Sequence, residues 1–204
     1  MLTLETLVLQ QDDFRLTADW QVAAGERVAL IGPSGAGKST LLMALAGFFA
    51  PAQGRVLWQG RDLAEIAPGD RPLTILFQDQ NLFPHLTLAQ NLGLGLSPTL
   101  RLSSAQTAQI DTALTRVGLA GMGARKPGQL SGGQQGRAAL ARALLRARPV
   151  LLLDEPFAAL GPALKAEMLG LLAAVLAGGL TVPAAAQSVT TVVNTADGAI
   201  NGST

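Results

Sequence analysis

Short apolar runs alternate with turn-forming residues in the first third of the chain. Residues 27–31, 55–58 and 73–77 each form such a run and predict buried strands. Between the first two runs, residues 41–46 are rich in Leu and Ala and are followed by Gly47, which predicts a helix that ends at this glycine. Strands that alternate with helices indicate a parallel sheet whose faces are largely covered.

The pattern becomes helical in the middle of the chain, over residues 79–148. Strand-like runs fade there, and residues 86–94 and 105–117 have the composition of helices. Residues 149–153 then return to a fully apolar run, which predicts another buried strand. The order of elements therefore predicts an α/β core interrupted by a helical insertion.

The last part of the chain has an unusual composition, because no formal charge occurs between Glu167 and Asp197. An apolar stretch there is nearly long enough to span a bilayer, but glycines and a proline interrupt it, which disfavours a transmembrane helix. We expect a helix over 163–177 instead, followed by a pair of short strands at 180–182 and 191–200 that close a hairpin, with a turn at Asp197 and Gly198.

Composition excludes several classes of function. The chain has 204 residues, with 15 basic and 14 acidic side chains and a formal net charge of +1. A nearly neutral chain has no basic excess with which to neutralise the phosphates of a duplex, so we expect no nucleic-acid partner. The absence of cysteine rules out disulfides, zinc–thiolate sites and cysteine nucleophiles.

The strongest chemical signal is the sequence GPSGAGKST, which matches G-x-x-x-x-G-K-[ST] between a predicted strand and a predicted helix. Glycines let successive backbone N–H groups point at phosphate oxygens, and the positive end of the following helix faces the same point. Lys38 supplies a cation for the outer phosphates, and Ser39 supplies a hydroxyl for Mg²⁺. The candidate nucleotide-binding residues are Gly32, Pro33, Ser34, Gly35, Ala36, Gly37, Lys38, Ser39 and Thr40.

Two adjacent carboxylates follow the apolar run that ends at residue 153. A strand of an open α/β sheet delivers such groups at its carboxyl end, where ligands bind. Asp154 is placed to hold Mg²⁺, and Glu155 is placed to polarise the water that attacks the γ-phosphate. An acidic pair at the start of a helix is the alternative, because Pro156 suits a first helical turn.

A second phosphate-binding device lies in the middle of the chain. Ser131 is a good N-cap residue, and two glycines after it leave backbone N–H groups accessible at a helix N-terminus. One phosphate loop already serves one nucleotide, so a second device suggests a nucleotide shared between two copies of the chain; a plain capped helix is the alternative. The residues of this candidate signature are Leu130, Ser131, Gly132, Gly133 and Gln134.

These motifs and their order resemble the ATP-binding subunits of ABC transporters, with Gln78 in LFQDQ as the Q-loop between the Walker A motif and the LSGGQ signature. The resemblance implies a P-loop NTPase fold: a RecA-like α/β core of residues 1–78 and 149–204 with a mixed, mainly parallel sheet, and a helical subdomain of residues 79–148. It also implies ATP and Mg²⁺ as ligands, with Mg²⁺ held by Ser39, Gln78 and Asp154. A head-to-tail homodimer is implied too, in which the signature of one copy closes over the ATP of the other.

A narrower resemblance is carried by residues 72–102 and by the short start of residues 1–16, which look like the ATP-binding subunits of bacterial thiamine importers. It implies a peripheral subunit on the cytoplasmic side of the inner membrane. Its partners would be transmembrane permease subunits and, indirectly, a periplasmic solute-binding protein. An importer of another small solute is the alternative, and a non-transport ABC ATPase acting on DNA or ribosomes is disfavoured by the near-zero charge.

The sequence departs from the family pattern at several places, among them Gln135 and Gly136, which replace the commoner Arg and Gln of the signature. Gln187 stands where the family has a switch histidine, so we assign it to the catalytic site with Glu155, although an amide cannot carry charge or relay a proton. Gly161 replaces the usual Asp of the D-loop, and Gln11 stands where an aromatic residue is expected beside adenine, which leaves Phe14 as the nearest aromatic. The C-terminal part is also expected to be shortened. An ATP-binding module with impaired hydrolysis is therefore a further alternative.

Overall fold

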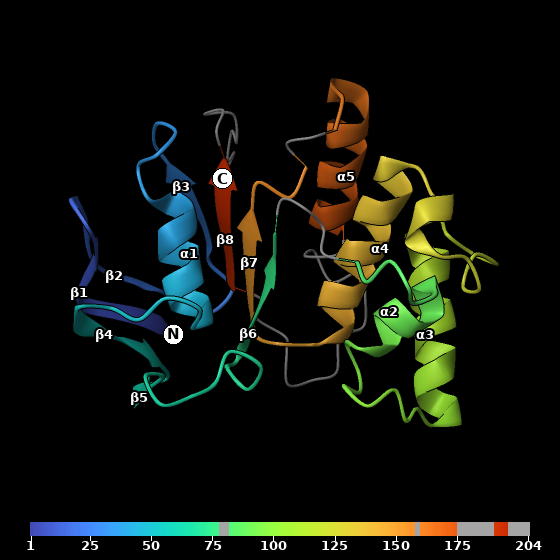
Figure 1. Ribbon diagram of the computed structural model, residues 1–204, viewed down its shortest axis with the longest axis horizontal. Coiled ribbons are helices and arrows are strands. Elements are labelled where there is room, and N and C mark those ends of the chain that lie inside the picture. The colour runs from blue at the N-terminus through green and yellow to red at the C-terminus, as the bar shows by residue number, and fades with distance from the viewer. Residues whose placement is uncertain (78–81, 158–159, 175–189, 196–204) are drawn as a thin grey trace. The chain divides into compact units, whose positions relative to one another are not determined.

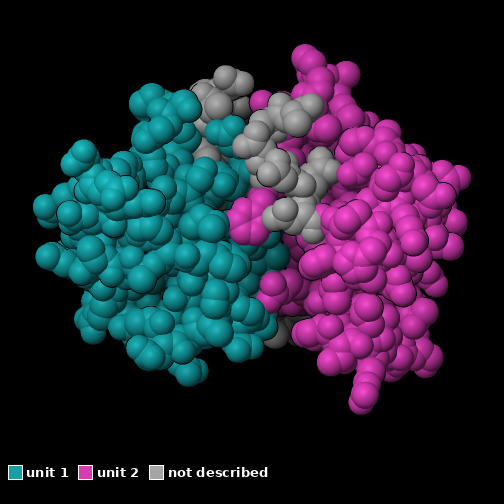
Figure 2. All heavy atoms as spheres, viewed as in Figure 1, with its two compact units in different colours: residues 1–75, 148–155, 188–204 teal, residues 76–147, 156–187 magenta. Residues whose placement is uncertain are grey.

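The computed structural model describes residues 1–77, 82–157, 160–174 and 190–195. These residues form two compact units (Figure 2). Unit 1 consists of Met1–Ile75, Arg148–Glu155 and Ser188–Thr204, and unit 2 of Leu76–Ala147 and Pro156–Gln187. The described residues of the stretch after Glu155, including 160–174, thus group with the helical unit, whereas the sequence pattern predicts them in the core.

Unit 1 contains a four-stranded antiparallel sheet in the order β2-β1-β4-β5 (Figure 1). Its strands are β1 (Leu2–Gln11), β2 (Phe14–Val22), β4 (Gln53–Trp58) and β5 (Arg61–Asp62), and every neighbouring pair is antiparallel. The sequence pattern predicts β4, but β1 and β2 are not among its predictions.

A bulge in β1 explains why this strand is hard to recognise. Leu2 and Leu4 are buried, and the next buried leucines are Leu7 and Leu9, so the alternation changes phase between Leu4 and Leu7. Thr6 has a φ of +43° at this point, and the pairing with both neighbouring strands shifts register there. An extra residue of this kind places all four leucines on the core face, although their spacing breaks the period of two.

The second sheet has the order β3-β8-β7-β6 and carries the predicted chemistry (Figure 1). Its strands are β3 (Arg27–Ile31), β8 (Thr190–Thr195), β7 (Val150–Asp154) and β6 (Leu73–Leu76). The strand β8 is parallel to both β3 and β7. The carboxyl ends of β3, β8 and β7 therefore meet at one edge of the sheet.

The pairing of β8 corrects the hairpin expected at residues 191–200. A strand has only two edges, and those of Thr190–Thr195 are already occupied by β3 and β7. This strand is therefore an interior parallel strand and not one arm of a hairpin. The other expected strand, residues 180–182, lies outside the described residues, as does the turn expected at Asp197 and Gly198.

The helix α1 (Lys38–Ala46) begins directly after the glycine-rich loop and ends as predicted at Gly47, which has a φ of +89°. Its buried leucines, Leu41, Leu42 and Leu45, share a core cluster with the buried side of β1. Val150 and Leu152 of β7 belong to the same cluster. The core of unit 1 thus fixes the helix that follows the glycine-rich loop against the strand that carries the two carboxylates.

The C-terminus of α1 is capped by a buried arginine. Arg71 is 6% exposed and donates to the carbonyl oxygens of Ala44 at 3.0 Å, Leu45 at 2.8 Å and Ile66 at 3.1 Å. Burial lowers the pKa of its guanidinium from the usual value, while Asp62 acts in the opposite direction. A cation at this end of the helix also complements the helix dipole.

Replacing Arg71 by Met is expected to lower the free energy of unfolding by about 2–3 kcal/mol, because buried carbonyl oxygens lose their donors. The urea midpoint of the purified chain measures this loss. The matched control is Arg61→Met on exposed β5, which we expect to change stability by less than about 0.5 kcal/mol. Equal midpoints for the two variants would contradict a capping role for Arg71.

Unit 2 is helical, as the sequence pattern predicts. Its helices are α2 (Leu88–Gly93), α3 (Ser104–Arg116), α4 (Gly132–Leu145) and α5 (Pro162–Ala174), with a short 3₁₀ turn at Pro127–Gln129. Capping boxes start α2, α3 and α4, and their apolar faces share one core. Within the described part of the chain, none of the helices combines the length and the hydropathy needed to cross a bilayer.

Candidate functional site

The candidate phosphate site is the loop that joins β3 to α1. Gly35 and Gly37 have φ values of +79° and +85°, a left-handed conformation that glycine adopts without steric cost. Gly37 is the N-cap residue of α1 and has no side chain with which to cap the helix. The first N–H groups of α1 are therefore available to an anion, which the positive end of the helix also favours.

The side chain of Lys38 folds back over this loop. Its Nζ donates to the carbonyl oxygens of Gly32 and Pro33, both at 2.9 Å. Residues 33–36 are exposed, so the loop is accessible from solvent. A phosphate that binds here offers the ammonium group an ionised acceptor in place of neutral carbonyls, and such charge-assisted hydrogen bonds are stronger.

A hydroxyl and a carboxylate meet where α1 and β7 approach each other. Ser39 Oγ donates to Asp154 Oδ1 at 2.9 Å, although the two residues are 115 positions apart. Oxygen ligands of this kind are those that Mg²⁺ prefers, and this ion usually completes its shell with water and substrate phosphates. Across the described residues no group of three or more His, Cys, Asp and Glu side chains converges. The pair therefore fits a phosphate-associated Mg²⁺ site better than an all-protein metal cage.

Glu155 follows Asp154 at the carboxyl end of β7. Its φ is +44°, in the left-handed region that non-glycine residues rarely adopt, and its side chain is half-buried. Backbone conformations of this kind cost of order 1–3 kcal/mol and cluster at functional sites. The next helix, α5, begins only at Pro162, so the acidic pair does not lie directly at a helix start, and the role of Glu155 in chemistry stays a prediction.

An aromatic side chain packs against the glycine-rich loop. A Cβ atom placed on Gly37 would overlap the ring of Phe14 and would lie 3.0 Å from Leu16 Cδ1. Gly37 is therefore required both for its φ value and for the space that Phe14 occupies. Phe14 was expected only as the aromatic nearest to position 11, beside adenine, and its contact with Gly37 of the loop was not predicted.

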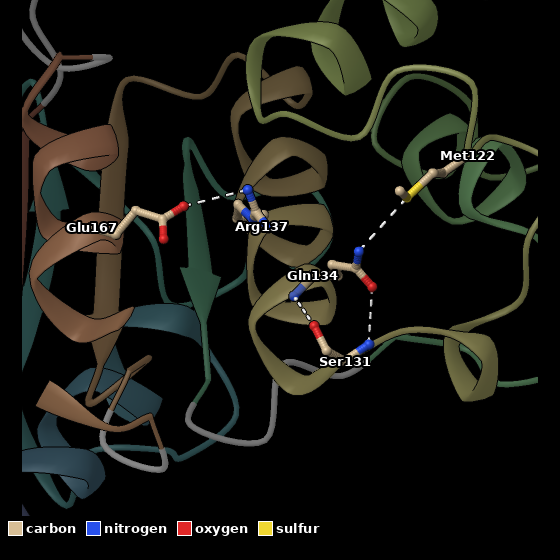
Figure 3. Close-up of polar contacts among 5 residues, drawn as sticks. All are labelled: Met122, Ser131, Gln134, Arg137 and Glu167. Atoms are coloured by element: carbon tan, nitrogen blue, oxygen red, sulfur yellow. Dashed lines mark hydrogen bonds and ion pairs between the residues drawn. The ribbon is translucent and has the colours of Figure 1, made fainter. Parts of the chain in front are cut away.

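The signature turn is organised by its own side chains (Figure 3). Ser131 Oγ accepts a hydrogen bond from the Gln134 N–H at 3.3 Å, and the Ser131 N–H donates to Gln134 Oε1 at 3.0 Å. Gln134 Nε2 contacts Met122 Sδ at 3.9 Å, which fixes the other end of the amide. Because Ser131 Oγ serves as an acceptor in this box, its hydroxyl proton remains available to an acceptor outside the turn.

Gln135, which was not among the predicted site residues, stabilises the turn that precedes the signature. Gln135 Nε2 donates to the carbonyl oxygens of Pro127 at 3.1 Å and Leu130 at 3.3 Å. Leu130 itself is 8% exposed and belongs to the core of unit 2. These contacts fix the turn that precedes α4, and with it the position of the N-terminus of α4.

The structure brings some of the predicted site residues together and leaves others undescribed. Gly32 to Thr40, Asp154 and Glu155 belong to unit 1, whereas Leu130 to Gln134 belong to unit 2. Gln78 and Gln187 lie outside the described residues. The strand that follows Gln187 is β8, whose register places Asn194 opposite Asp154 and Thr195 opposite Ile31. The end of β8 therefore lies beside the ends of β3 and β7, the two strands that are followed by the glycine-rich loop and by Glu155.

A strand–loop–helix with Lys38 and Ser39 after its loop, a carboxylate pair at the end of another strand of the same sheet, and a serine–glycine helix start are the features of an ATP-binding cassette. Residues 17–158 match the family described as ABC transporter. The chain belongs to this family and is one of its ATP-binding, ATP-hydrolysing subunits.

Named relatives narrow the class. The thiamine import ATP-binding protein ThiQ of Cereibacter sphaeroides is 70% identical over 87% of this chain and 77% of its own length. Proteins of the same name from Ruegeria sp. and Yersinia pestis are 57% and 52% identical, each over 84% of this chain and over 74% and 72% of their own lengths. Among solved structures, the dimeric post-hydrolysis state of the ATP-binding cassette MJ0796, bound to ADP and Pi, matches with a TM-score of 0.76 and 27% identity over 95% of this chain and 88% of that one.

Proposed function

We propose that this chain is the ATPase subunit of a bacterial thiamine importer, which couples ATP hydrolysis to solute uptake. The observation that carries the ATPase assignment is the 2.9 Å hydrogen bond between Ser39 and Asp154, which joins the glycine-rich loop to the carboxylate pair. Thiamine as the solute is supported by the names of the relatives described above. No residue of this chain needs to touch thiamine, because other subunits of such importers select the solute.

ATP binds first, with its phosphates against the N-terminus of α1. The uncapped N–H groups of this helix and the ammonium group of Lys38 provide the positive potential. Lys38 must exchange its carbonyl partners for β- and γ-phosphate oxygens. The left-handed glycines at 35 and 37 let the loop backbone approach the phosphates closely.

Ser39 and Asp154, together with Gln78, would hold Mg²⁺, which neutralises charge on the β- and γ-phosphate oxygens when bound. The Ser39 hydroxyl would then direct a lone pair to the ion, and its present hydrogen bond to Asp154 would open. Both side chains are already within reach of each other, so little rearrangement is required.

Glu155 provides the base in the hydrolytic step. Its carboxylate polarises a water molecule and accepts a proton from it as the water oxygen attacks the γ-phosphorus. The bond between the γ-phosphorus and the bridging oxygen breaks, and that oxygen leaves with ADP. Gln187 is proposed to lie at the same γ-phosphate, where its amide would donate a hydrogen bond but would not relay a proton.

A second copy of the chain completes the nucleotide site. We place Ser131, Gly132 and Gly133 of that copy against the γ-phosphate held by Lys38, with Leu130 and Gln134 supporting the turn. The free hydroxyl proton of Ser131 and the N–H groups at the start of α4 are the donors. The dimeric state of the solved structural neighbour supports this arrangement.

Transport requires partners that this chain does not contain. We place it on the cytoplasmic side of the inner membrane, bound to permease subunits near Gln78 and served indirectly by a periplasmic solute-binding protein. In this arrangement, closure of the ATP-bound dimer drives the permease.

Thiamine uptake tests the whole proposal. We expect the chain to restore uptake of labelled thiamine in a bacterium that lacks its own thiamine-importer ATPase, and to co-purify with that importer's permease. The control is uptake of an unrelated solute through its own ABC importer, which should not change. Restored uptake of another small solute without thiamine would replace thiamine in the proposal, and a failure to bind ATP would end the proposal as a whole.

An ATP-binding module with impaired hydrolysis is the second candidate, and one feature favours it. Gln187 stands at the position where the family resemblance places a switch histidine. The chain would then bind ATP and dimerise but hydrolyse slowly. Single-turnover hydrolysis by the wild type and by Gln187→His separates the two candidates, because only the impaired module should gain rate from the histidine.

A further inference from the structure

The two glycines of the signature turn have different surroundings. Both lie in the first turn of α4, and neither has a positive φ. A Cβ atom on Gly132 would meet no heavy atom within 4 Å. A Cβ atom on Gly133 would lie 2.5 Å from Leu164 Cδ2 and 3.0 Å from Leu164 Cδ1. Packing within this chain therefore requires glycine at 133 but not at 132.

The atoms that exclude a side chain at Gly133 come from α5. Gly133 is buried, and Leu164 is half-buried in the first turn of α5. The two methyl groups of Leu164 thus fill the volume directly behind the first turn of α4. Protein interiors are close-packed, so a group in this position determines where the turn can lie.

A second contact between the same two helices lies one turn further along (Figure 3). Arg137 Nη1 is 3.3 Å from Glu167 Oε1. Arg137 follows Gly133 by four residues and Glu167 follows Leu164 by three, and these spacings keep both contacts on one face of each helix. The Glu167 side chain is 56% exposed, so the ion pair contributes orientation more than stability.

We infer that Leu164 is a positioning residue of the signature turn. By filling the space at Gly133, it sets where the Ser131 hydroxyl and the first N–H groups of α4 lie when they meet the ATP of a second copy. The helix that carries Leu164 begins at Pro162, seven residues after Glu155 in the chain. The contact therefore ties the signature turn, which serves the partner's ATP, to the helix that follows this chain's own base. The inference rests on the proposed function.

A rescue experiment tests this assignment. The background is Glu155→Gln, which should slow hydrolysis and prolong the closed dimer, and ATP-dependent dimerisation is measured by analytical ultracentrifugation. We expect Gly133→Ala to weaken dimerisation about tenfold or more, because the added methyl overlaps Leu164. Adding Leu164→Ala vacates that space and is expected to restore the dimerisation constant to within about threefold of the parent.

Two matched pairs show whether the rescue is specific. Leu169 is on the same helix and is 38% exposed, and Leu169→Ala should not rescue Gly133→Ala. Any loss of dimerisation in Gly132→Ala should likewise not be rescued by Leu164→Ala, because a methyl at Gly132 meets no described atom of this chain within 4 Å. ADP affinity, which we assign mainly to the glycine-rich loop and Lys38, should remain unchanged in Leu164→Ala, whereas a general loss of structure would lower it.

If Gly133→Ala stays equally weak with and without Leu164→Ala, the methyl acts on the partner's nucleotide and the inference is wrong. If Gly133→Ala does not fold, Leu164→Ala alone decides: unchanged dimerisation contradicts a positioning role, and weakened dimerisation with normal ADP affinity supports it. A parent that neither binds ATP nor dimerises contradicts the proposed function as well. A parent that dimerises while rescue fails contradicts the inference alone.

Discussion

Replacing Lys38 by Ala is expected to weaken ATP binding about 10- to 100-fold while the fold persists. The reason is that Lys38 supplies a cation at the glycine-rich loop, and a hydrogen bond to an ionised group contributes about 1.5–3 kcal/mol. Within the described residues, its Nζ donates to the carbonyl oxygens of Gly32 and Pro33, and we expect the loop to keep its fold without these two bonds. Isothermal titration with ATP and Mg²⁺ measures the affinity.

The matched control is Lys126→Ala, which removes the same charge from an exposed position outside the proposed site. Both variants should keep the thermal midpoint of the wild type to within a few degrees, but only Lys38→Ala should lose affinity. Unchanged ATP affinity in Lys38→Ala would show that the loop does not bind triphosphate, and the ATPase assignment would fail with it.

Local sequence patterns predicted the parts of the site that one segment can build alone. The loop from Gly32 to Ser39, its helix and its terminating Gly47 follow from residue types at fixed spacings, and the structure contains each of them. The Ser131 N-cap follows in the same way, because a capping box joins residues three positions apart. The loop, the helix and the capping box each depend on residues close together in the sequence, so sequence patterns predict them.

Features that depend on distant residues were not predictable in this way. The C-terminus of α1 is capped by Arg71, and the sequence around Arg71 does not indicate that Ala44 and Leu45 accept its hydrogen bonds. The contact of Leu164 with Gly133 joins two helices through packing alone. The bulge at Thr6 breaks the alternation of β1, so the pattern there does not read as a strand.

The C-terminal strand shows the same limit in a different form. Residues 190–195 are compatible with a hairpin or with a parallel strand, because both need β-branched residues. What decides between them is that β3 and β7 leave room for one strand between them, and β8 pairs with both. This arrangement belongs to the whole sheet and is not visible in residues 190–195. This outcome matters for chemistry because β8 ends beside Ile31 and Asp154, the residues that precede the loop and Glu155.

Replacing Glu155 by Gln is expected to leave ATP affinity close to that of the wild type and to slow hydrolysis by about 10²- to 10⁴-fold. Glutamine keeps the size of the side chain and the constraint at φ +44°, but it cannot accept a proton from water. Single-turnover hydrolysis of labelled ATP, with the affinity measured in parallel, separates the two quantities. The variant should also accumulate the ATP-bound dimer, because the step that reopens it is blocked.

Glu65→Gln is the control for this prediction, since it neutralises an exposed carboxylate of unit 1 that is outside the proposed site and should hydrolyse ATP like the wild type. The comparison also tests the impaired-module alternative. If the wild type is already as slow as Glu155→Gln, the base is not being used, and the switch position becomes the limiting element. Recovery of rate in Gln187→His, and its loss again when Glu155→Gln is added, would then show that Glu155 works only beside a group able to hold the γ-phosphate and relay a proton. If Glu155→Gln hydrolyses at the rate of an active wild type, Glu155 is not the base.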